Sequence, residues 1–438
     1  MLIEFSVANF RSFRDRVTLS LEAEPRISER DKTVDERNVA HTPDGDLLRV
    51  VGIYGANAGG KSNLVTALTT FRALVLNSAR EGQSGDLLPA APFRLDAESL
   101  AAPSEFEVVF TQAGSQIRYG AAFTTKRVER EWLFVRPNGA DEEERWFERS
   151  KKAFETGGAW VRDPGIEKKT RAEALHLSAA AAWNHDQAEH ILGWFQKSLL
   201  LIDSSMDNIA YTLGLLAMDA YHDKICALIR RLDFGVEDLQ TRDMDAESAA
   251  HFHRFFGALR TAIPDLNENF PEKLPQELVT IRQGVAFELR EESAGTKKAI
   301  ALAGPIVGTL DRGGVLAIDE FDARLHTLLA KQLVELFQDP ATNPHDAQLV
   351  FTSHDTNLLT RTLLRRDQLW FVEKSHKTHA SDLYSLAEIR LDDGKAIRND
   401  ARYESDYLQG RYGAIPFFGN LKALLGEALS PTAPKKDE

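Results

Sequence analysis

The sequence predicts an α/β fold with a mixed or parallel sheet, an antiparallel β subdomain and a helical insertion. An apolar run, a glycine-rich turn and an amphipathic segment follow one another over residues 50–76, in the strand–loop–helix order that parallel sheets use. Three strand-like runs separated by turn residues lie within 105–135. From residue 173 to 259 the apolar residues recur at helical spacing.

The composition sets the first limits. The chain has 438 residues, a formal net charge of −13 and one cysteine, Cys226. This length accommodates two or three domains with a large core, and the negative charge disfavours nonspecific coating of nucleic acid, although a local basic patch stays open. One cysteine excludes a disulfide framework or a thiolate cluster within the chain, so we interpret Cys226 as a packed thiol. We see no secretory signal and no run near the roughly 20 apolar residues of a membrane span, so we expect a cytoplasmic protein without membrane contact.

The elements are expected in the following order. Strands are predicted at 2–10, 17–21 and 50–54, followed by a helix to about residue 76, while 22–46 and 77–104 are expected to be loops. Antiparallel strands are predicted at 105–110, 117–123, 127–135 and 145–149, with a hairpin turn at Gly114. Helices are predicted at 173–182, 187–201, 213–232 and 246–260.

The C-terminal part returns to alternating strands and helices. Strands are predicted at 279–289, 315–318, 348–351, 369–373 and 383–391, and helices at 297–310 and 327–337. We therefore expect four parts: a first lobe at 1–135, a mainly helical insertion at 136–278, a second lobe at 279–430 and a disordered tail at 431–438.

A phosphate-binding loop is the strongest motif. The spacing G-x-x-x-x-G-K-S is typical of nucleotide hydrolases, because glycines let backbone N–H groups approach a polyphosphate and the following helix directs its positive end toward it. Lys61 can reach the outer phosphates, and the Ser62 hydroxyl can bind Mg²⁺. The predicted nucleotide-binding residues of the loop are Gly55, Ala56, Asn57, Ala58, Gly59, Gly60, Lys61 and Ser62.

Two carboxylates follow a predicted buried strand. Asp319 and Glu320 come directly after the apolar run 315–318. Combined with the phosphate loop, this pattern predicts Asp319 in the Mg²⁺ shell and Glu320 as the base that polarises the attacking water. A carboxylate partly shut off from solvent beside a polyphosphate should have a raised pKa. Without the loop, the pair would be weaker evidence, because strands often end in acidic turns.

The stretch 291–296 resembles the signature motif of ABC-type ATPases, whose core is Ser-x-Gly before a helix. The resemblance implies that Ser293 and Gly295 close over the nucleotide held by a second copy of the chain. A plain helix N-cap at Ser293 is the alternative. Residues 320–326 then match the D-loop along the dimer seam, and His354, after the strand 348–351, matches the switch histidine that contacts the γ-phosphate.

These elements, in this order, resemble the RecF/SMC/OLD branch of ABC ATPases. Residues 9–13, Asn-Phe-Arg-Ser-Phe, are typical of that branch. Residues 370–374 and 407–416 bring the chain closer to the AAA_15/AAA_21 ATPases of bacterial anti-phage and abortive-infection loci, including Rlo-type and PARIS-type proteins. Arg11 is a phosphate contact by resemblance, with an exposed arginine as the alternative. For 407–416 we expect a structural clasp on the second lobe.

The sequence departs from this family at two places. Ala294 stands where many relatives have an acidic residue, and no Q-loop glutamine can be placed, since Gln83 lies in a predicted loop and 92–96 has none. Two weaker signals are interpreted as surface: His376 and His379 as a solvated loop, and Arg361, Arg365 and Arg366 as a solvated helix face.

The resemblance implies an ATP- and Mg²⁺-dependent ATPase that forms a homodimer or higher oligomer through composite ATP sites. It further implies a sensor or regulator of anti-phage defence that controls a separate effector, such as a Toprim-type nuclease or a toxin. The alternative is a RecF-like DNA-repair ATPase acting directly on DNA, which the charge of −13 does not favour. A transporter subunit is a third reading, which the opening strands and the helical insertion disfavour.

Overall fold

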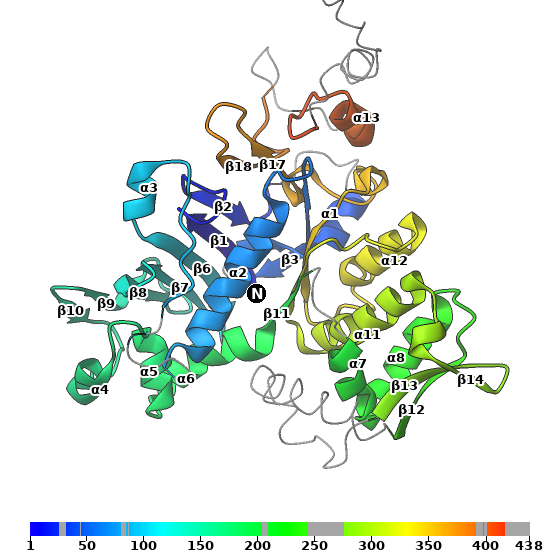
Figure 1. Cartoon of the computed structure of the whole chain (residues 1–438), viewed down its shortest axis with the longest axis horizontal. Helices are drawn as coiled ribbons and strands as arrows, with labels where there is room; N and C mark the ends of the chain where they lie inside the picture. Colours follow the sequence, from blue (N-terminus) through cyan, green and yellow to red (C-terminus); the bar gives the residue numbers. More distant parts are fainter. Residues whose placement is uncertain are drawn as a thin grey trace, which may run out of the picture.

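The computed structural model describes residues 1–25, 32–43, 45–79, 85, 87–203, 209–243, 276–390, 397 and 401–416. Two large sheets organise these residues, a seven-stranded antiparallel sheet and a six-stranded, mostly parallel one (Figure 1). The predicted α/β class, with its mixed sheet and antiparallel β subdomain, is confirmed. None of the helices in the described part of the chain combines the length and apolar character needed to cross a bilayer.

The seven-stranded sheet has the order β10-β9-β8-β7-β6-β1-β2, and every neighbouring pair is antiparallel. The turn between β6 and β7 is the predicted hairpin: Ala113 and Gly114 both have positive φ, as a two-residue turn that follows the strand twist requires. The strands are β1 (Leu2–Ala8), β2 (Val17–Ser20), β6 (Ser104–Gln112), β7 (Ser115–Phe123), β8 (Val128–Arg136), β9 (Glu144–Ser150) and β10 (Phe154–Thr156).

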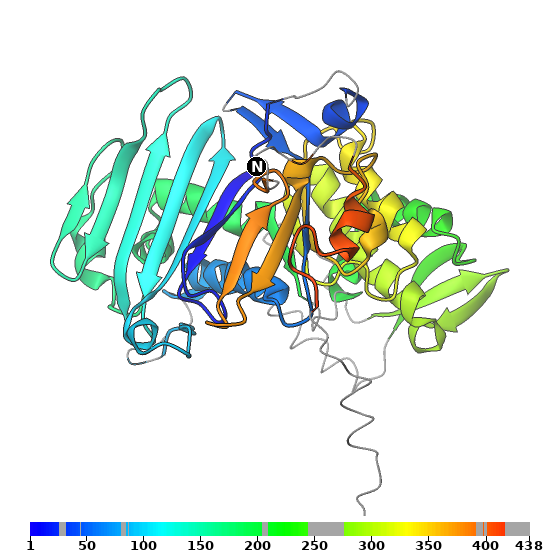
Figure 2. The ribbon, with the colours of Figure 1, turned by 90° about the horizontal axis from the view of Figure 1, so that it is seen from above.

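The six-stranded sheet has the order β11-β15-β16-β5-β17-β18. The first five strands are parallel, and only β18 runs antiparallel, beside β2 of the other sheet (Figure 2). The carboxyl ends of β15, β16 and β5 therefore meet at one edge. The strands are β11 (Leu199–Ile202), β15 (Val315–Ile318), β16 (Gln348–Thr352), β5 (Val50–Tyr54), β17 (Leu369–Lys374) and β18 (Ser381–Ser385).

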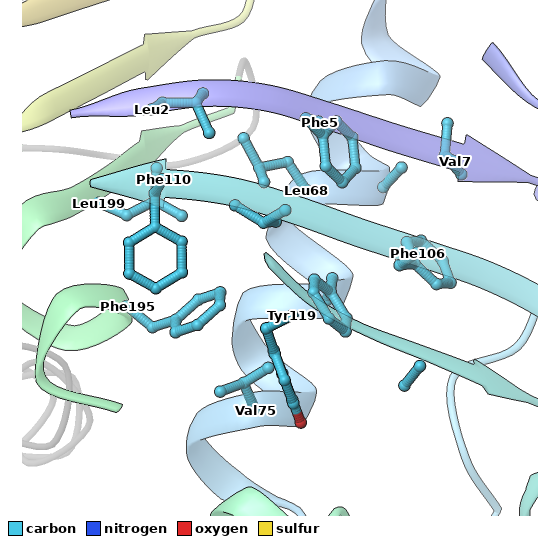
Figure 3. Packing of buried hydrophobic residues seen from close by; sticks show 14 of the residues in the cluster. Leu2, Phe5, Val7, Leu68, Val75, Phe106, Phe110, Tyr119, Phe195 and Leu199 are labelled. Carbon is cyan, nitrogen blue, oxygen red and sulfur yellow. The ribbon is translucent and has the colours of Figure 1, made fainter. Parts of the chain in front are cut away.

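Alternate residues of β5 pack on opposite faces of the six-stranded sheet. Val51 and Ile53 belong to the same core cluster as helix α2 (Lys61–Asn77), whereas Val50 and Tyr54 pack with α11 (Ala294–Arg312) and α12 (Thr327–Gln338). On its other side α2 contacts the antiparallel sheet, so this helix fills the space between the two sheets. Figure 3 shows Leu68 and Val75 of α2 beside Phe5, Phe106 and Tyr119.

The remaining helices cover the edges of this core. α5 and α6 lie against α2 and the antiparallel sheet, and α7 and α8 pack on α11 (Figure 1). A three-stranded sheet, β12-β13-β14, precedes α11, and a small hairpin, β3-β4, precedes β5. The remaining helices and strands are α1 (Lys32–Asn38), β3 (Val39–Thr42), β4 (Gly45–Leu48), α3 (Ala97–Ala101), α4 (Pro164–Lys169), α5 (His176–Ala182), α6 (Asp186–Gly193), α7 (Ile209–Leu216), α8 (Asp219–Arg231), β12 (Asp238–Asp243), β13 (Gln276–Arg282), β14 (Val285–Glu288) and α13 (Tyr403–Leu408).

Several predicted elements are wrong. The described part of the predicted loop 22–46 holds α1, β3 and the start of β4, because apolar residues such as Val39 and Ala40 are buried despite the polar composition. The predicted helix 187–201 ends at Gly193, passes through a π-helical turn and becomes strand β11, since its last residues pair with β15. The predicted helix 213–232 is two helices, α7 and α8, and the predicted strand 279–289 is a hairpin that turns at Gln283 and Gly284.

Two further expectations differ from the structure. The stretch 136–278 was expected to be mainly helical, but it contains strands β9 to β12 and the start of β13, and the boundary at 135 cuts the antiparallel sheet. Arg365 and Arg366 are not a solvated face, since their side chains are only 11% and 10% exposed and pair with Asp35, Asp367 and Glu24. The predictions for 246–260, Gln83 and 431–438 lie outside the described residues.

Candidate active site

The phosphate loop connects β5 to α2 and needs glycine at its two ends. Gly55 has φ of 151°, and a Cβ there would lie 2.3 Å from the carbonyl oxygen of Val372. Gly60 has φ of 125°, and its Cβ would lie 2.6 Å from Ser381 Oγ. Ser381 Oγ also donates a hydrogen bond to the Gly59 carbonyl at 2.5 Å. The loop is therefore held against the β17–β18 hairpin, which only residues without a side chain allow.

Lys61 is a buried cation at the start of α2. Its side chain is only about 6% exposed, and Nζ donates to the carbonyl oxygens of Gly55 at 2.7 Å and Ala56 at 3.2 Å. Burial lowers the pKa of Lys61 to about 8, although the nearby carboxylates of Asp319, Asp322 and Glu320 act in the opposite direction. An anion bound beside the loop would favour the charged form of this lysine.

Thr352, at the end of β16, holds the acidic turn after β15. Its Oγ1 donates to Asp319 Oδ1 at 2.6 Å and accepts from the Glu320 N–H at 2.8 Å. Its carbonyl oxygen accepts from the Phe321 N–H at 3.0 Å. Asp319 is buried, and Glu320 has φ of 51°, a left-handed conformation that costs free energy for a non-glycine residue. Thr352 thus fixes the direction in which Glu320 leaves the sheet.

His354 lies at the same edge of the sheet. The backbone N–H of His354 donates to both carboxylate oxygens of Asp322, at 3.3 and 3.4 Å, while the His354 side chain is exposed to solvent. Partial desolvation and the charge of Lys61 lower the pKa of His354, and Asp322 and Glu320 oppose this shift. The lowered pKa favours the neutral imidazole, in which one ring nitrogen donates a hydrogen bond and the other accepts one.

One cavity of about 900 Å³ brings most of the predicted residues together, although Gly55 and Asp319 are not among the residues that line it. A volume of this size suits a cofactor or nucleotide, and the lining is rich in backbone amides, hydroxyls and lysine ammonium groups that bind phosphate. Ser12 and Lys374 belong to the family-like stretches 9–13 and 370–374 but were not predicted as site residues, and they reach this cavity from the turn after β1 and from β17. The lining residues are Ser12, Ala56, Asn57, Ala58, Gly59, Gly60, Lys61, Ser62, Asn63, Glu320, Asp322, Ala323, His354 and Lys374.

Arg11 lies at the rim of this cavity. Its guanidinium donates to Asn63 Oδ1 at 3.3 Å, and Asn63 Nδ2 donates to Ser12 Oγ at 2.8 Å. The turn that carries Arg11 is thereby joined to the first turn of α2. Arg11 is exposed and does not line the cavity itself.

The oxygen donors at this edge suit a hard cation. Ser62 is one of the residues that line the cavity, and Asp319 lies buried next to Glu320. Hydroxyl and carboxylate oxygens are the ligands that Mg²⁺ accepts, usually together with water and phosphate oxygens. Ser62 and Asp319 are therefore the residues that fit the predicted Mg²⁺.

The predicted signature residues do not line the same cavity. Ser293 caps α11 by accepting the Thr296 N–H at 3.1 Å, and it is exposed. A Cβ on Gly295 would lie 2.9 Å from the carbonyl oxygen of Arg324, so the signature turn packs on the stretch 321–326. Ala323 in that stretch lines the cavity. One short segment thus touches the cavity on one side and the signature turn on the other.

The stretch 407–416 packs on β17. The Tyr407 and Phe371 rings stack with centroids 5.3 Å apart, Tyr407 donates to the Ala414 carbonyl at 3.1 Å, and Tyr384 donates to the Tyr412 carbonyl at 2.8 Å. Through these contacts, Ala414 to Pro416 line a second cavity of about 340 Å³, which Ala56 to Gly59 of the phosphate loop also line. Such packing is what the expected clasp requires.

Comparisons with known proteins give one family match and several similar solved structures. The family described as "AAA domain, putative AbiEii toxin, Type IV TA system" (AAA_21) matches residues 50–360. No curated protein gave a significant match. Similar solved structures include the SMC head domain from Thermotoga maritima, at 14% identity and a TM-score of 0.39 over 88% of this chain and 98% of that one. An SMC head bound to the C-winged helix domain of ScpA has 13% identity and a TM-score of 0.41 over 90% of this chain and 98% of that one. RecF of the RecFOR pathway has 11% identity and a TM-score of 0.30 over 87% of this chain and 98% of that one. Since the family match spans most of its length, the chain belongs to the AAA_21 family of AAA-domain ATPases.

Proposed function

We propose that this chain is a Mg²⁺-dependent ATPase that works as a dimerising switch. The observation that carries the proposal is that Lys61, Ser62, Glu320 and His354, which lie far apart in the sequence, line one cavity. A phosphate loop, a base and a switch histidine in one cavity are the parts that hydrolysis of a triphosphate needs.

Each residue then has a specific task. The amides of the loop and Lys61 bind the phosphates of ATP, while Mg²⁺, held by Ser62 and Asp319, neutralises charge that develops on them. Glu320, aimed by Thr352, accepts the proton of the attacking water. His354 hydrogen-bonds the γ-phosphate.

The signature turn supports a composite site. Ser293 and Gly295 lie outside the cavity of their own chain, and Ser293 is exposed where a second copy could bring its own cavity to it. We infer that Ser293 and Gly295 of one copy complete the ATP site of the other, so that ATP closes a homodimer, or pairs within a higher oligomer, and hydrolysis reopens it.

A complementation assay tests the composite site. Lys61→Ala removes the phosphate contact and Ser293→Arg blocks the signature, so each variant alone should lose turnover by about 100-fold or more. Mixing the two inactive variants should restore activity, because one of the two composite sites in the heterodimer keeps both Lys61 and Ser293. Arg290→Ala, at a neighbouring exposed position outside the signature stretch 291–296, is the control and should stay active. Absence of restored activity, with both variants folded and dimeric, would refute the composite site.

The biological role is a further proposal. The family description names a toxin of a toxin–antitoxin system, and the sequence resembles ATPases of anti-phage loci. We therefore propose that the chain senses infection or regulates a separate effector, a Toprim-type nuclease or a toxin. Expression with and without the neighbouring gene during phage infection tests this, and protection that needs both genes and Lys61 supports it. Salt-dependent binding of the ATP-bound chain to DNA, without any need for a second gene, would favour the RecF-like alternative instead.

A further inference from the structure

A histidine, a cysteine and an aspartate converge between α8 and β12, away from the ATP cavity. His222 and Cys226 are four residues apart on α8 and so lie on one face of that helix, and Asp238 is the first residue of β12. Their ligand atoms all lie within 4.8 Å of one another, and both ring nitrogens of His222 are 4.0 Å from Cys226 Sγ. We propose that His222, Cys226 and Asp238 bind one divalent transition-metal ion of the zinc class.

The chemistry of the donors selects this class of metal. Sulfur, imidazole nitrogen and carboxylate oxygen together suit Zn²⁺, whereas Mg²⁺ prefers oxygen alone. A tetrahedral zinc site needs ligand atoms roughly 3.3 to 3.8 Å apart, so the present spacing of up to 4.8 Å must close by roughly 1 to 1.5 Å. Cys226 is fully buried, while His222 and Asp238 are half-buried and can rotate to make this adjustment. Their exposed side leaves a path for the ion and a position for a water ligand.

The surroundings already orient the histidine. His222 Nε2 is 3.3 Å from the Leu239 carbonyl oxygen, and a proton donated there leaves Nδ1 as the free acceptor for a metal. Arg230 is the nearest competing cation, but its Nε donates to the Glu237 carbonyl at 2.7 Å and its NH2 stays 3.9 Å from Asp238 Oδ1. The carboxylate is thus not closed off by a tight ion pair.

Metal binding must displace the thiol proton. Burial raises the pKa of Cys226 to about 11, so the thiol holds its proton at neutral pH. Formation of the sulfur–metal bond breaks the S–H bond, and the proton leaves to solvent past the half-exposed Asp238. Affinity should therefore rise with pH.

The position of the site gives the ion a mechanical consequence. β12 pairs with β13, and Thr280 and Arg282 of β13 hold the buried Glu292 at 2.5 and 2.7 Å, directly before Ser293. An ion that ties α8 to β12 would brace the sheet on which the signature turn rests.

The test uses the full chain, freed of metal by a chelator and titrated with Zn²⁺ alone. Equilibrium dialysis should give one high-affinity zinc per chain, and Co²⁺ should produce a thiolate-to-cobalt charge-transfer band. Cys226→Ser and His222→Ala should each abolish that band or weaken zinc binding by about 100-fold, since even loss of an outer-shell partner costs 10- to 100-fold. His190→Ala, at an exposed position outside the cluster, is the control and should bind as the wild type does.

Two outcomes would overturn the proposal. One is that the wild-type chain binds no zinc at micromolar concentration. The other is that it binds zinc with the same affinity in the Cys226 and His222 variants. If Cys226→Ser fails to fold, Asp238→Asn replaces it as the test variant, because Asp238 is half-exposed and not part of the packed core. This variant should bind zinc at least about 10-fold more weakly than the wild type.

Discussion

Glu131 and Asp319 are both buried carboxylates, one in the antiparallel sheet and one at the end of a parallel strand. Glu131 accepts hydrogen bonds from the Tyr119 hydroxyl at 2.9 Å and from the backbone N–H groups of His176 and Leu177 at 2.7 and 3.0 Å, and it pairs with Arg149 at 2.9 Å. Asp319, within the described part of the chain, receives one side-chain hydrogen bond, from Thr352.

This difference separates a structural charge from a functional one. A carboxylate with four donors has no capacity left for a ligand, and its role is to join strand β8 to the start of α5. In the described part of the chain, protein groups leave lone pairs of Asp319 unused, and the neighbouring Glu320 lines a cavity that can hold a cation and a polyphosphate. Lys61 is the corresponding positive charge. Its hydrogen bonds go to neutral carbonyl oxygens rather than to a carboxylate, so its charge is available to an anionic ligand.

Lys61→Met should have the largest effect on activity and almost none on folding. Loss of a phosphate contact made by a preorganised cation should reduce ATP turnover about 100- to 1,000-fold. Without nucleotide, the variant should be as stable as the wild type or more stable by about 1 kcal/mol, because a buried ammonium that burial disfavours is removed. Steady-state turnover and thermal melting of the nucleotide-free chain measure the two effects. A large loss of stability would show that Lys61 is structural, like Glu131.

Glu131→Gln should show the reverse pattern. The amide cannot accept from Arg149 and from all three other donors, so a buried charge loses its partner at a cost of about 3 to 5 kcal/mol. Turnover per folded molecule should stay near the wild-type value. Denaturant unfolding measures the loss, and Glu148→Gln, which removes the exposed pair with Arg130, is the matched control with an expected change under about 1 kcal/mol. Equal stability of the Glu131 and Glu148 variants would show that Glu131 is not a structural carboxylate.

The sequence located the site better than it located the elements around it. The loop 55–62 and the pair Asp319 and Glu320 were predictable because their spacing is local and the chemistry requires those residue types. Thr352, Ser12 and Lys374 were not, since they reach the site only through strand order and through the turn after β1. A serine or threonine two residues before His354 was the signal available for Thr352, and it is common at strand ends.

The wrong elements have a similar cause. The apolar end of the predicted helix 187–201 suits a helix or a buried strand equally, and only its pairing with β15 decides in favour of β11. α1 and the β3–β4 hairpin were hidden by polar residues that tertiary contacts satisfy, as when Asn38 donates to the Leu363 carbonyl at 3.2 Å. In both places long-range contacts outweigh local preference.

Thr352→Val should have an intermediate effect confined to the chemical step. Valine has a similar shape but can neither donate to Asp319 nor accept from the Glu320 N–H, so Glu320 loses its orientation. We expect kcat to fall about 10- to 100-fold with a small change in KM, and Thr352→Ser to recover most of the loss. A purely structural role would instead lower stability and leave kcat per folded molecule unchanged. Steady-state kinetics and unfolding of the three proteins distinguish these results.

The smallest predicted effect compares two histidines whose pKa values are both lowered. His176 is buried between Phe147, Phe154 and Trp160, and burial lowers its pKa to about 3, with Arg149 and His185 acting in the same direction and Glu167 opposing. His354, in contrast, is exposed at the cavity. Between about pH 6.5 and 3 the unfolded chain binds a proton at His176 that the folded chain does not bind. The contribution of the neutral His176 to the free energy of unfolding is therefore fully present above pH 6.5 and is lost as the pH falls toward 3.

His176→Gln should remove this dependence. The free energy of unfolding of the wild type, relative to the variant, should fall by up to about 1.4 kcal/mol for each pH unit below 6, because each unit of unfavourable protonation adds that amount. Urea unfolding at pH 7.5, 6.5, 5.5 and 4.5 measures the difference, and titrations common to both proteins cancel in it. His354→Gln should give a shallower slope, since an exposed ring takes up its proton with less penalty. Parallel curves for the wild type and His176→Gln would show that His176 accepts a proton inside the folded lobe, which would contradict the dry, aromatic surroundings of this ring.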